Sequence, residues 1–189
     1  MKHFDIYTDC AGSENEFGIS FVVFEGEEDE KIYKFKTNTE SLNKEFGVDN
    51  KVSNTSIAEC YAIFKALLFL KDEKEFSAKI YTDNDHAFML LNKLCRIKKR
   101  QKKIGHLLSC IVGRCKQLNP HPNSFRRNIQ VCHINGHIGI YGNEIANIAA
   151  QHAKNRKEID VSKRGYKFNV FESYKSDSIS VIQYFKSSS

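Results

Sequence analysis

The sequence has no apolar run of about 18 residues, the minimum for a membrane-spanning helix, and no secretory signal at its start. Nothing in it directs the chain into or across a membrane, so we expect an intracellular protein without a membrane partner. With 189 residues and 41% hydrophobic content, the chain can bury one adequate core.

Cysteine pairs with the close spacing of zinc ligands are also absent. The nearest two of the six cysteines, Cys110 and Cys115, are five residues apart. Most cysteines fall within apolar patterns, which is typical of small buried hydrophobic residues. We therefore expect free thiols rather than a disulfide framework or a zinc site.

Acidic residues are missing from a long central part of the chain. No aspartate or glutamate occurs between Asp85 and Glu144, whereas eleven lysines and arginines do. These charges exceed the net charge of +6, so the rest of the chain is net acidic. A short basic helix face is usually only solvated, and that alternative stays open for residues 98–103 alone. The length of the uncompensated stretch favours a surface that faces a polyanion.

The hydrophobic pattern predicts an α/β fold. Apolar runs bounded by turn signals predict five strands, at residues 3–8, 17–24, 31–37, 78–82 and 129–134. Helical spacing predicts helices at residues 56–71, 84–95, 101–118 and 143–155. The polar residues 38–54 are predicted to form a loop. Three strands followed by alternating helices and strands indicate one mixed sheet covered by helices.

Three acidic residues occupy positions where the local pattern has no structural use for a carboxylate. Asp9 and Asp83 end apolar strands, and Glu59 lies in an apolar helical stretch, on one face with Ala62 and Ala66. If the two strands are parallel neighbours, both aspartates reach the same edge of the sheet. A buried carboxylate is costly unless it is paired with a cation or bound to a metal. The pattern therefore predicts a metal site.

Four motifs, in this order, resemble those of type 1 ribonuclease H. The first, an aspartate after a strand, is Tyr7-Thr8-Asp9-Cys10-Ala11-Gly12-Ser13. The second and third are Thr55-Ser56-Ile57-Ala58-Glu59 and Ile80-Tyr81-Thr82-Asp83-Asn84. The last is a Gly-His-x-Gly loop leading into a Gly-Asn-Glu helix start, from Gly136 to Asn147. The resemblance covers residues 3 to about 154 and implies a ribonuclease H-like fold, a five-stranded mixed sheet flanked by helices.

The resemblance implies an endonuclease that cuts the RNA strand of RNA·DNA hybrids and leaves 3′-hydroxyl and 5′-phosphate ends. Phosphodiester hydrolysis needs an activated water and neutralisation of an anionic transition state, and two Mg²⁺ ions roughly 4 Å apart supply both. Because Mg²⁺ prefers carboxylate oxygens, Asp9 is expected to bridge the ions while Glu59 and Asp83 complete the site. Mn²⁺ is expected to substitute for Mg²⁺.

Asn147 stands where the family usually has a fourth metal-binding aspartate. Its neutral amide oxygen removes one negative charge, so the water-activating ion should bind more weakly. Three explanations stay open: a natural active variant, a substitution introduced to trap a complex, and a degenerate protein that binds without cutting. Glu144, one helical turn earlier, could substitute for the missing carboxylate.

A histidine in the last motif is a candidate catalytic group. His137 follows Gly136 and precedes Gly139 in a loop beside the expected carboxylates. A lone histidine is most often structural, but the resemblance favours a role in proton transfer or product release. His133, at a strand end, has no such support.

Substrate-binding residues are less well defined by the sequence. The resemblance places four polar residues at positions that contact the hybrid: Asn15, Asn54, Thr55 and Ser56. Ser56 replaces a usual asparagine and Asp85 a usual glutamine, and a turn or cap role is the alternative for each polar residue. The chain has no tryptophan, so the aromatic residue of the family's basic protrusion is missing. Charge alone is expected to bind phosphates there, through Lys98, Lys99, Lys102 and Lys103.

The resemblance divides the chain after residue 155. We expect residues 1–155 to form the catalytic domain of a monomer. Residues 156–189 are expected to form a C-terminal extension that packs on the core or docks a protein partner. Two functions compete: a hybrid-specific endonuclease and a hybrid-binding accessory module with an impaired active site. A DNA-strand transferase on the same fold is disfavoured by the Gly-His-x-Gly loop.

Overall fold

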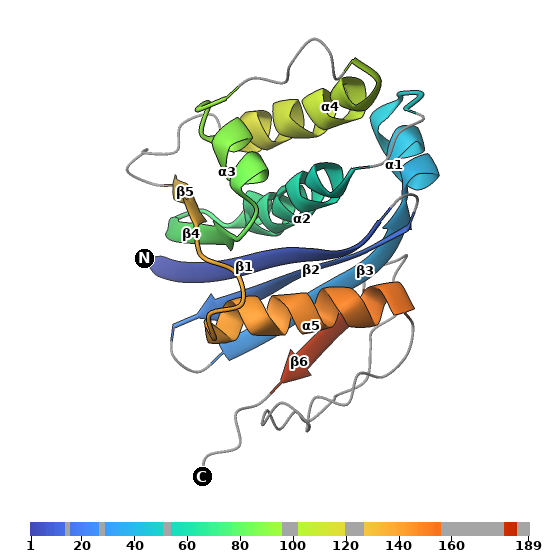
Figure 1. The fold of residues 1–189 in the computed structure, drawn as a ribbon. Helices are drawn as coiled ribbons and strands as arrows, with labels where there is room; N and C mark the ends of the chain where they lie inside the picture. Colours follow the sequence, from blue (N-terminus) through green and yellow to red (C-terminus); the bar gives the residue numbers. More distant parts are fainter. Residues whose placement is uncertain are drawn as a thin grey trace.

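One mixed sheet of six strands organises the computed structural model of the chain (Figure 1). The residues described are 1–13, 16–26, 29–50, 54–95, 102–119, 127–155 and 180–184. The strands are β1 (Lys2–Ser13), β2 (Glu16–Glu25), β3 (Asp29–Asn38), β4 (Phe76–Thr82), β5 (Arg127–His133) and β6 (Ser180–Tyr184). The helices are α1 (Thr39–Phe46), α2 (Thr55–Phe69), α3 (Asp85–Leu91), α4 (Lys102–Leu118) and α5 (Tyr141–Asn155), with a short 3-10 turn, η1 (Leu70–Asp72), after α2.

The strand order is β5-β4-β1-β2-β3-β6. The central strand β1 runs antiparallel to β2 and parallel to β4, and β4 is parallel to β5. In the β1/β4 register Tyr7 lies opposite Tyr81. Asp9 and Asp83, each two residues further on, therefore stand at the same level of neighbouring strands, as the sequence predicted. β1 continues to Ser13, however, so Asp9 lies within its strand rather than at the end that the sequence predicted.

The helices lie in two layers on the sheet. Helices α1 to α4 cover one face and α5 covers the other (Figure 1). The larger core fills the first face and includes Phe4, Ile6 and Ile80, which are fully buried. On the other face Ile145 and Ala149 of α5 pack on β2 and β3. The side chains of β4 alternate between buried and more exposed positions, as a strand with one covered face requires.

The predicted α/β fold is confirmed, and the five predicted strands and four predicted helices are present. Residues 39–46 correct one prediction, because they form α1 rather than a loop. Asn38 caps this helix by accepting a hydrogen bond from the Ser41 amide, and Gly47 ends it with a φ of 65°. β6 adds a sixth strand that the sequence did not predict, antiparallel to β3. Helix α3 ends at Leu91 rather than at residue 95.

The cysteines are all free, as expected. Only Cys60 and Cys115 are buried, and the other four are partly exposed, so the expectation that most of them are buried is wrong. Among the described helices, none has the length and apolar character needed to cross a membrane.

Candidate metal and active site

Helix α2 carries a carboxylate into the protein interior. The helix begins after Asn54, whose side chain accepts a hydrogen bond from the Ser56 amide. Ala62 and Ala66 are fully buried, and their small side chains let this face lie close to the sheet. Glu59 shares that face and is 5% exposed. The expectation that this glutamate points inward is therefore confirmed.

Asp9, Glu59 and Asp83 form one carboxylate cluster. One oxygen atom from each lies within 4.8 Å of the others. Asp9, like Glu59, is 5% exposed. The Oδ2 atom of Asp9 and the Oε2 atom of Glu59 are buried without a hydrogen-bond partner among the described residues. Such unpaired buried oxygens fit a centre completed by a cation.

The cluster is strained electrostatically in the absence of a cation. Burial, and next the nearby Asp83 carboxylate, raise the pKa of Asp9 to about 8. Burial and the Asp9 carboxylate likewise raise the pKa of Glu59 well above its usual value. Within the described residues, no lysine or arginine forms an ion pair with any of the three. Divalent cations would relieve both the burial penalty and the mutual repulsion.

Two residues of the last motif hold Asp83 in place. The Asn143 side-chain nitrogen donates a hydrogen bond to Oδ2 of Asp83 at 3.2 Å. A Cβ atom on Gly136 would lie 2.7 Å from the same oxygen, so a larger residue there would displace the carboxylate. Neither residue was assigned a role from the sequence, although both belong to the motif that carries the resemblance.

Cys10 makes contacts that were not predicted from the sequence. Its backbone amide donates to Oδ1 of Asp9 at 2.6 Å, and its thiol donates to Oε1 of Glu59 at 3.3 Å. Burial, followed by the negative charge of Glu59, raises the pKa of the thiol. The only feature of the sequence that could have predicted these contacts is the position of Cys10 directly after Asp9.

Asn147 lies on α5, along one face with Asn143 and Gln151 at four-residue spacing. Its Oδ1 atom accepts a hydrogen bond from the Gln151 side chain. The negative charge of Glu144, in the first turn of the same helix, is among the causes of the raised pKa of Asp9. Asn147 as a metal ligand stays a prediction.

His137 is exposed and lies outside the carboxylate cluster. Its φ of 58° places it in the left-handed region, and Gly139 follows with a φ of 82°. Left-handed backbone is uncommon for a residue other than glycine and is often found at functional loops. The loop therefore presents the imidazole to solvent, at the start of the segment that leads to α5.

Three of the predicted substrate residues, Asn54, Thr55 and Ser56, are described in full, and the others lie partly or wholly outside the described part of the chain. Asn54 caps α2, Thr55 is exposed, and Ser56 is buried with its hydroxyl 3.0 Å from Nδ1 of His86. Asp85 forms an ion pair of 3.1 Å with His133. Residues outside the described part of the chain are Asn15, Lys98 and Lys99, and for Lys102 and Lys103 only the backbone, at the start of α4, is described.

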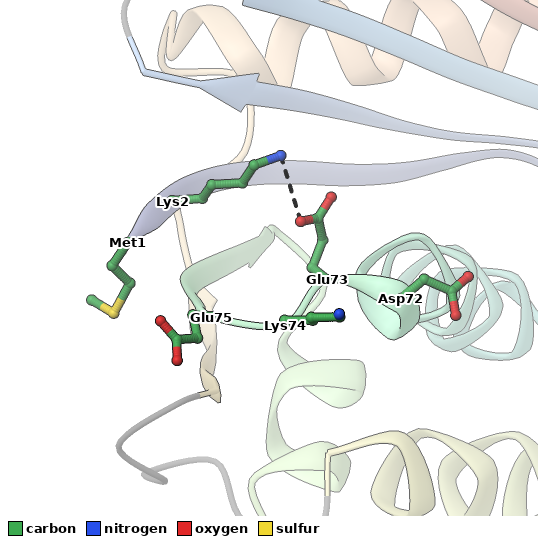
Figure 2. A pocket seen from close by; sticks show the side chains of 6 residues that line it. All are labelled: Met1, Lys2, Asp72, Glu73, Lys74 and Glu75. Carbon is green, nitrogen blue, oxygen red and sulfur yellow. Dashed lines mark ion pairs between the residues drawn. The ribbon is translucent and has the colours of Figure 1, made fainter.

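A shallow surface pocket lies at the beginning of β1 (Figure 2). Its lining mixes acidic and basic side chains: Met1, Lys2, Asp72, Glu73, Lys74 and Glu75. Lys2 crosses it to pair with Glu73 at 3.5 Å. Because Lys2 already pairs with Glu73 and none of Asp9, Glu59 and Asp83 lines this pocket, we assign no chemistry to it.

Comparisons with known proteins agree with the fold and identify a family. The family model of RNase H matches residues 1–155. RNase H1 from the halophilic archaeon Halobacterium salinarum NRC-1 has a TM-score of 0.58 and 15% identity, covering 82% of this chain and 99% of that one. The N-terminal RNase H domain of a Mycobacterium tuberculosis protein, solved as a fusion with maltose-binding protein, has a TM-score of 0.56 and 13% identity, covering 88% and 100%.

A third structure is LC9-RNase H1, described as a type 1 RNase H with the type 2 active-site motif. It has a TM-score of 0.56 and 14% identity, covering 88% of this chain and 82% of that one. At these identities the likeness establishes the fold. No curated protein matches the chain.

Proposed function

The chain belongs to the RNase H family of ribonucleases, and from this premise we propose that it cuts the RNA strand of RNA·DNA hybrids by two-metal-ion catalysis. The observation that carries the proposal is the cluster of Asp9, Glu59 and Asp83, with two buried carboxylate oxygens lacking a partner among the described residues. A protein that only binds nucleic acid has little use for three mutually repelling carboxylates at the edge of its sheet.

Mg²⁺ is the proposed cofactor, with Mn²⁺ as a substitute, because the cluster offers oxygen ligands. Two such ions, when bound, supply the activated water and stabilise the oxygen that leaves. Asp9, on the central strand β1, is the proposed bridging ligand. Glu59 and Asp83 would bind from α2 and from the end of β4, and Asn143 would keep Asp83 oriented.

Asn147 is the proposed fourth ligand, and a weaker one than aspartate. Its Oδ1 atom accepts a hydrogen bond from Gln151, and as a neutral amide oxygen it attracts a cation less than a carboxylate would. We therefore propose an active enzyme with a raised metal requirement. His137, exposed on its loop, would transfer protons or assist product release, because an imidazole can both accept and donate a proton.

Binding of the hybrid is proposed to use the rim of the cluster and the basic start of α4. Asn54, Thr55 and Ser56 lie at the start of α2, shortly before Glu59. Asn15 and the four lysines between residues 98 and 103 would add polar and phosphate contacts. We propose that residues 1–155 form the catalytic domain and that the protein acts as a monomer.

The test is cleavage of a hybrid with a labelled RNA strand by the metal-free protein, supplied with increasing Mg²⁺ or Mn²⁺. We expect cuts in the RNA strand only, activity that EDTA removes, and no cutting of a DNA duplex of the same sequence. Asp83→Asn should abolish cleavage, whereas Asp72→Asn, an exposed aspartate in η1, should leave it unchanged.

An accessory module that binds hybrids is the second candidate, because Asn147 is engaged with Gln151. This alternative predicts tight binding of the hybrid in a mobility-shift assay and no cleavage at any concentration of either metal. Absence of both binding and cleavage would contradict both candidates.

A further inference from the structure

The carboxylate cluster has a sulfur atom at its border. Cys10 lies on β1 directly after Asp9, and its Sγ atom is 3.3 Å from Oε1 of Glu59. Among the described residues, no other cysteine has a hydrogen bond to a carboxylate. An active centre expected to hold hard cations through oxygen alone therefore has a soft donor beside one of its ligands.

We propose that Cys10 and Glu59 form a binding site for a soft or borderline divalent cation such as Cd²⁺ or Zn²⁺. In a tetrahedral zinc site, metal–sulfur and metal–oxygen bonds of about 2.3 and 2.0 Å place two ligand atoms about 3.5 Å apart. The observed separation of 3.3 Å is close to that value. The two donor atoms can thus share one cation with only small side-chain movements, and the Cys10 thiol would release its proton to solvent as the metal–sulfur bond forms.

Further ligands come from the carboxylate cluster. Glu59 is buried, and its Oε2 atom has no hydrogen-bond partner among the described residues. Asp9 Oδ2 is likewise buried and unpartnered there, and oxygens of Asp9 and Asp83 lie within 4.8 Å of a Glu59 oxygen. Thiolate sulfur selects Zn²⁺ and Cd²⁺ over Mg²⁺, whereas carboxylates do not strongly discriminate. Cys10 therefore changes which metals the centre accepts.

The expected effect of this cation on catalysis rests on the proposed function, whereas its binding does not. Because Glu59 would be shared, a cation held with Cys10 would displace Mg²⁺ from Glu59 and inhibit hydrolysis. Binding itself can be measured without substrate, so failure of the nuclease proposal and failure of this proposal have different signatures.

The experiment is a titration of the full-length, metal-free protein with Cd²⁺ alone, followed through the sulfur-to-cadmium charge-transfer absorption in the ultraviolet. We expect the band to saturate at one equivalent. Cys10→Ser should remove it and weaken Cd²⁺ binding by at least about tenfold, the usual scale for a perturbed metal site. The matched control is Cys95→Ser. Cys95 is partly exposed, as Cys10 is, but it lies near the buried Cys60. The Cys95→Ser variant should bind Cd²⁺ like the unmodified protein.

An absorption band of equal size in Cys10→Ser would overturn the proposal. Loss of the band in Cys95→Ser would also overturn it, because Cd²⁺ would then be bound by the other thiols. If Cys10→Ser fails to fold by circular dichroism, Glu59→Gln, which keeps the thiol, must weaken Cd²⁺ binding by at least about tenfold; unchanged binding would again overturn it. In the cleavage assay, Cd²⁺ should inhibit the Mg²⁺-dependent reaction of both proteins. The Cd²⁺ concentration that halves the rate should be about tenfold higher for Cys10→Ser than for the unmodified protein, each measured against its own rate without Cd²⁺.

Discussion

The buried carboxylates make the stability of the metal-free protein depend on pH. The pKa of Asp9 is raised to about 8 in the folded protein, whereas an unfolded aspartate titrates near about 3.9. The folded protein therefore keeps a proton that the unfolded chain loses as the pH rises. Stability from this group is greatest below about pH 4 and is lost as the pH rises to about 8. The raised pKa of Glu59 acts in the same direction.

We therefore predict that Asp9→Asn stabilises the metal-free protein at pH 8 while abolishing Mg²⁺-dependent cleavage. For a chain of this size, each kcal/mol corresponds to roughly 2–4 °C in Tm, and a gain of at least about 3 °C is expected in EDTA. The gain should shrink at about pH 5.5, where wild-type Asp9 is already protonated. Asp72→Asn is the control and should show no such pH-dependent gain. Turnover like that of the wild type in Asp9→Asn would refute the metal assignment.

Asn147→Asp tests the fourth position. A carboxylate there adds a negative charge at the proposed water-activating ion, so the cleavage rate should rise and the Mg²⁺ concentration for half-maximal rate should fall, each by about tenfold. The measurement is cleavage rate against Mg²⁺ concentration for both proteins on one hybrid. Gln151→Ala serves as a companion variant, because it frees Oδ1 of Asn147 without adding charge. If Asn147→Asp changes neither quantity, Asn147 is not a metal-site residue.

At the residue scale the sequence predicted the carboxylates but not their neighbours. Asp9, Glu59 and Asp83 were found because burying a carboxylate within an apolar pattern is costly unless a cation or metal compensates its charge. Asn143 carries no such signal, since an asparagine near a helix start is ordinary, and for Cys10 the only signal is its position next to Asp9. Their contacts with Asp83 and Glu59 depend on distances between segments far apart in the chain.

At the element scale, close approach of α5 to β2 depends on glycine. A Cβ atom on Gly18 would lie 1.9 Å from the Ala150 carbonyl oxygen, so no side chain fits without moving α5. We predict that Gly18→Ala lowers the free energy of unfolding by about 1–3 kcal/mol, the usual cost of overpacking. Gly113→Ala in α4 is the matched control, because no atom of the described residues, apart from the neighbouring turns of its own helix, lies within 4 Å of its Cβ position. It should stabilise the protein by about 0.5–1 kcal/mol, and both values follow from urea unfolding.

A destabilisation of Gly113→Ala as large as that of Gly18→Ala would contradict this account of the packing. Reduced cleavage by Gly18→Ala at temperatures where it stays folded would show that the position of α5 also matters for the active site.

The basic segment gives a second prediction at this scale. Replacing Lys98, Lys99, Lys102 and Lys103 with glutamine should weaken hybrid binding and flatten its salt dependence. The slope of log affinity against log salt should change by roughly 0.9 for each phosphate that is no longer neutralised by a lysine. The control replaces four exposed lysines of other elements: Lys44, Lys71, Lys74 and Lys79. Equal slopes for the two quadruple variants would mean that the basic segment is only solvated.

Element prediction succeeded where periodicity was strong and failed where capping decided the structure. Helix α2 has a long apolar pattern and strand β4 alternates between buried and more exposed side chains, and both were found within a few residues. α1 was taken for a loop because its turns are polar, with Leu42 among its few apolar residues. Its stability comes from the Asn38 cap and from burial of Leu42, and the second of these depends on tertiary packing.

At the scale of the whole molecule, the sixth strand is the feature that the sequence could not supply. β6 pairs with β3 from Glu30 to Lys34, across a long separation in the chain, and pairing of that kind leaves little local signal. The family match ends at residue 155, before β6 begins. The carboxylate cluster lies on β1, on α2 and directly after β4, so none of its side chains belongs to the C-terminal part.

We therefore predict that a chain ending at residue 155 still cuts hybrids, at a rate close to that of the full chain, because β6 is remote from the carboxylates. Its Tm should fall, since removing β6 leaves the backbone of β3 unpaired at the sheet edge. It should nevertheless stay monomeric in light scattering, because charged residues such as Lys31, Lys34 and Lys36 in an edge strand oppose pairing with a second molecule. A folded, monomeric chain of residues 1–155 that binds hybrids but no longer cuts them would show that the C-terminal extension takes part in catalysis. A dimer would instead show that β6 is needed to cover the β3 edge.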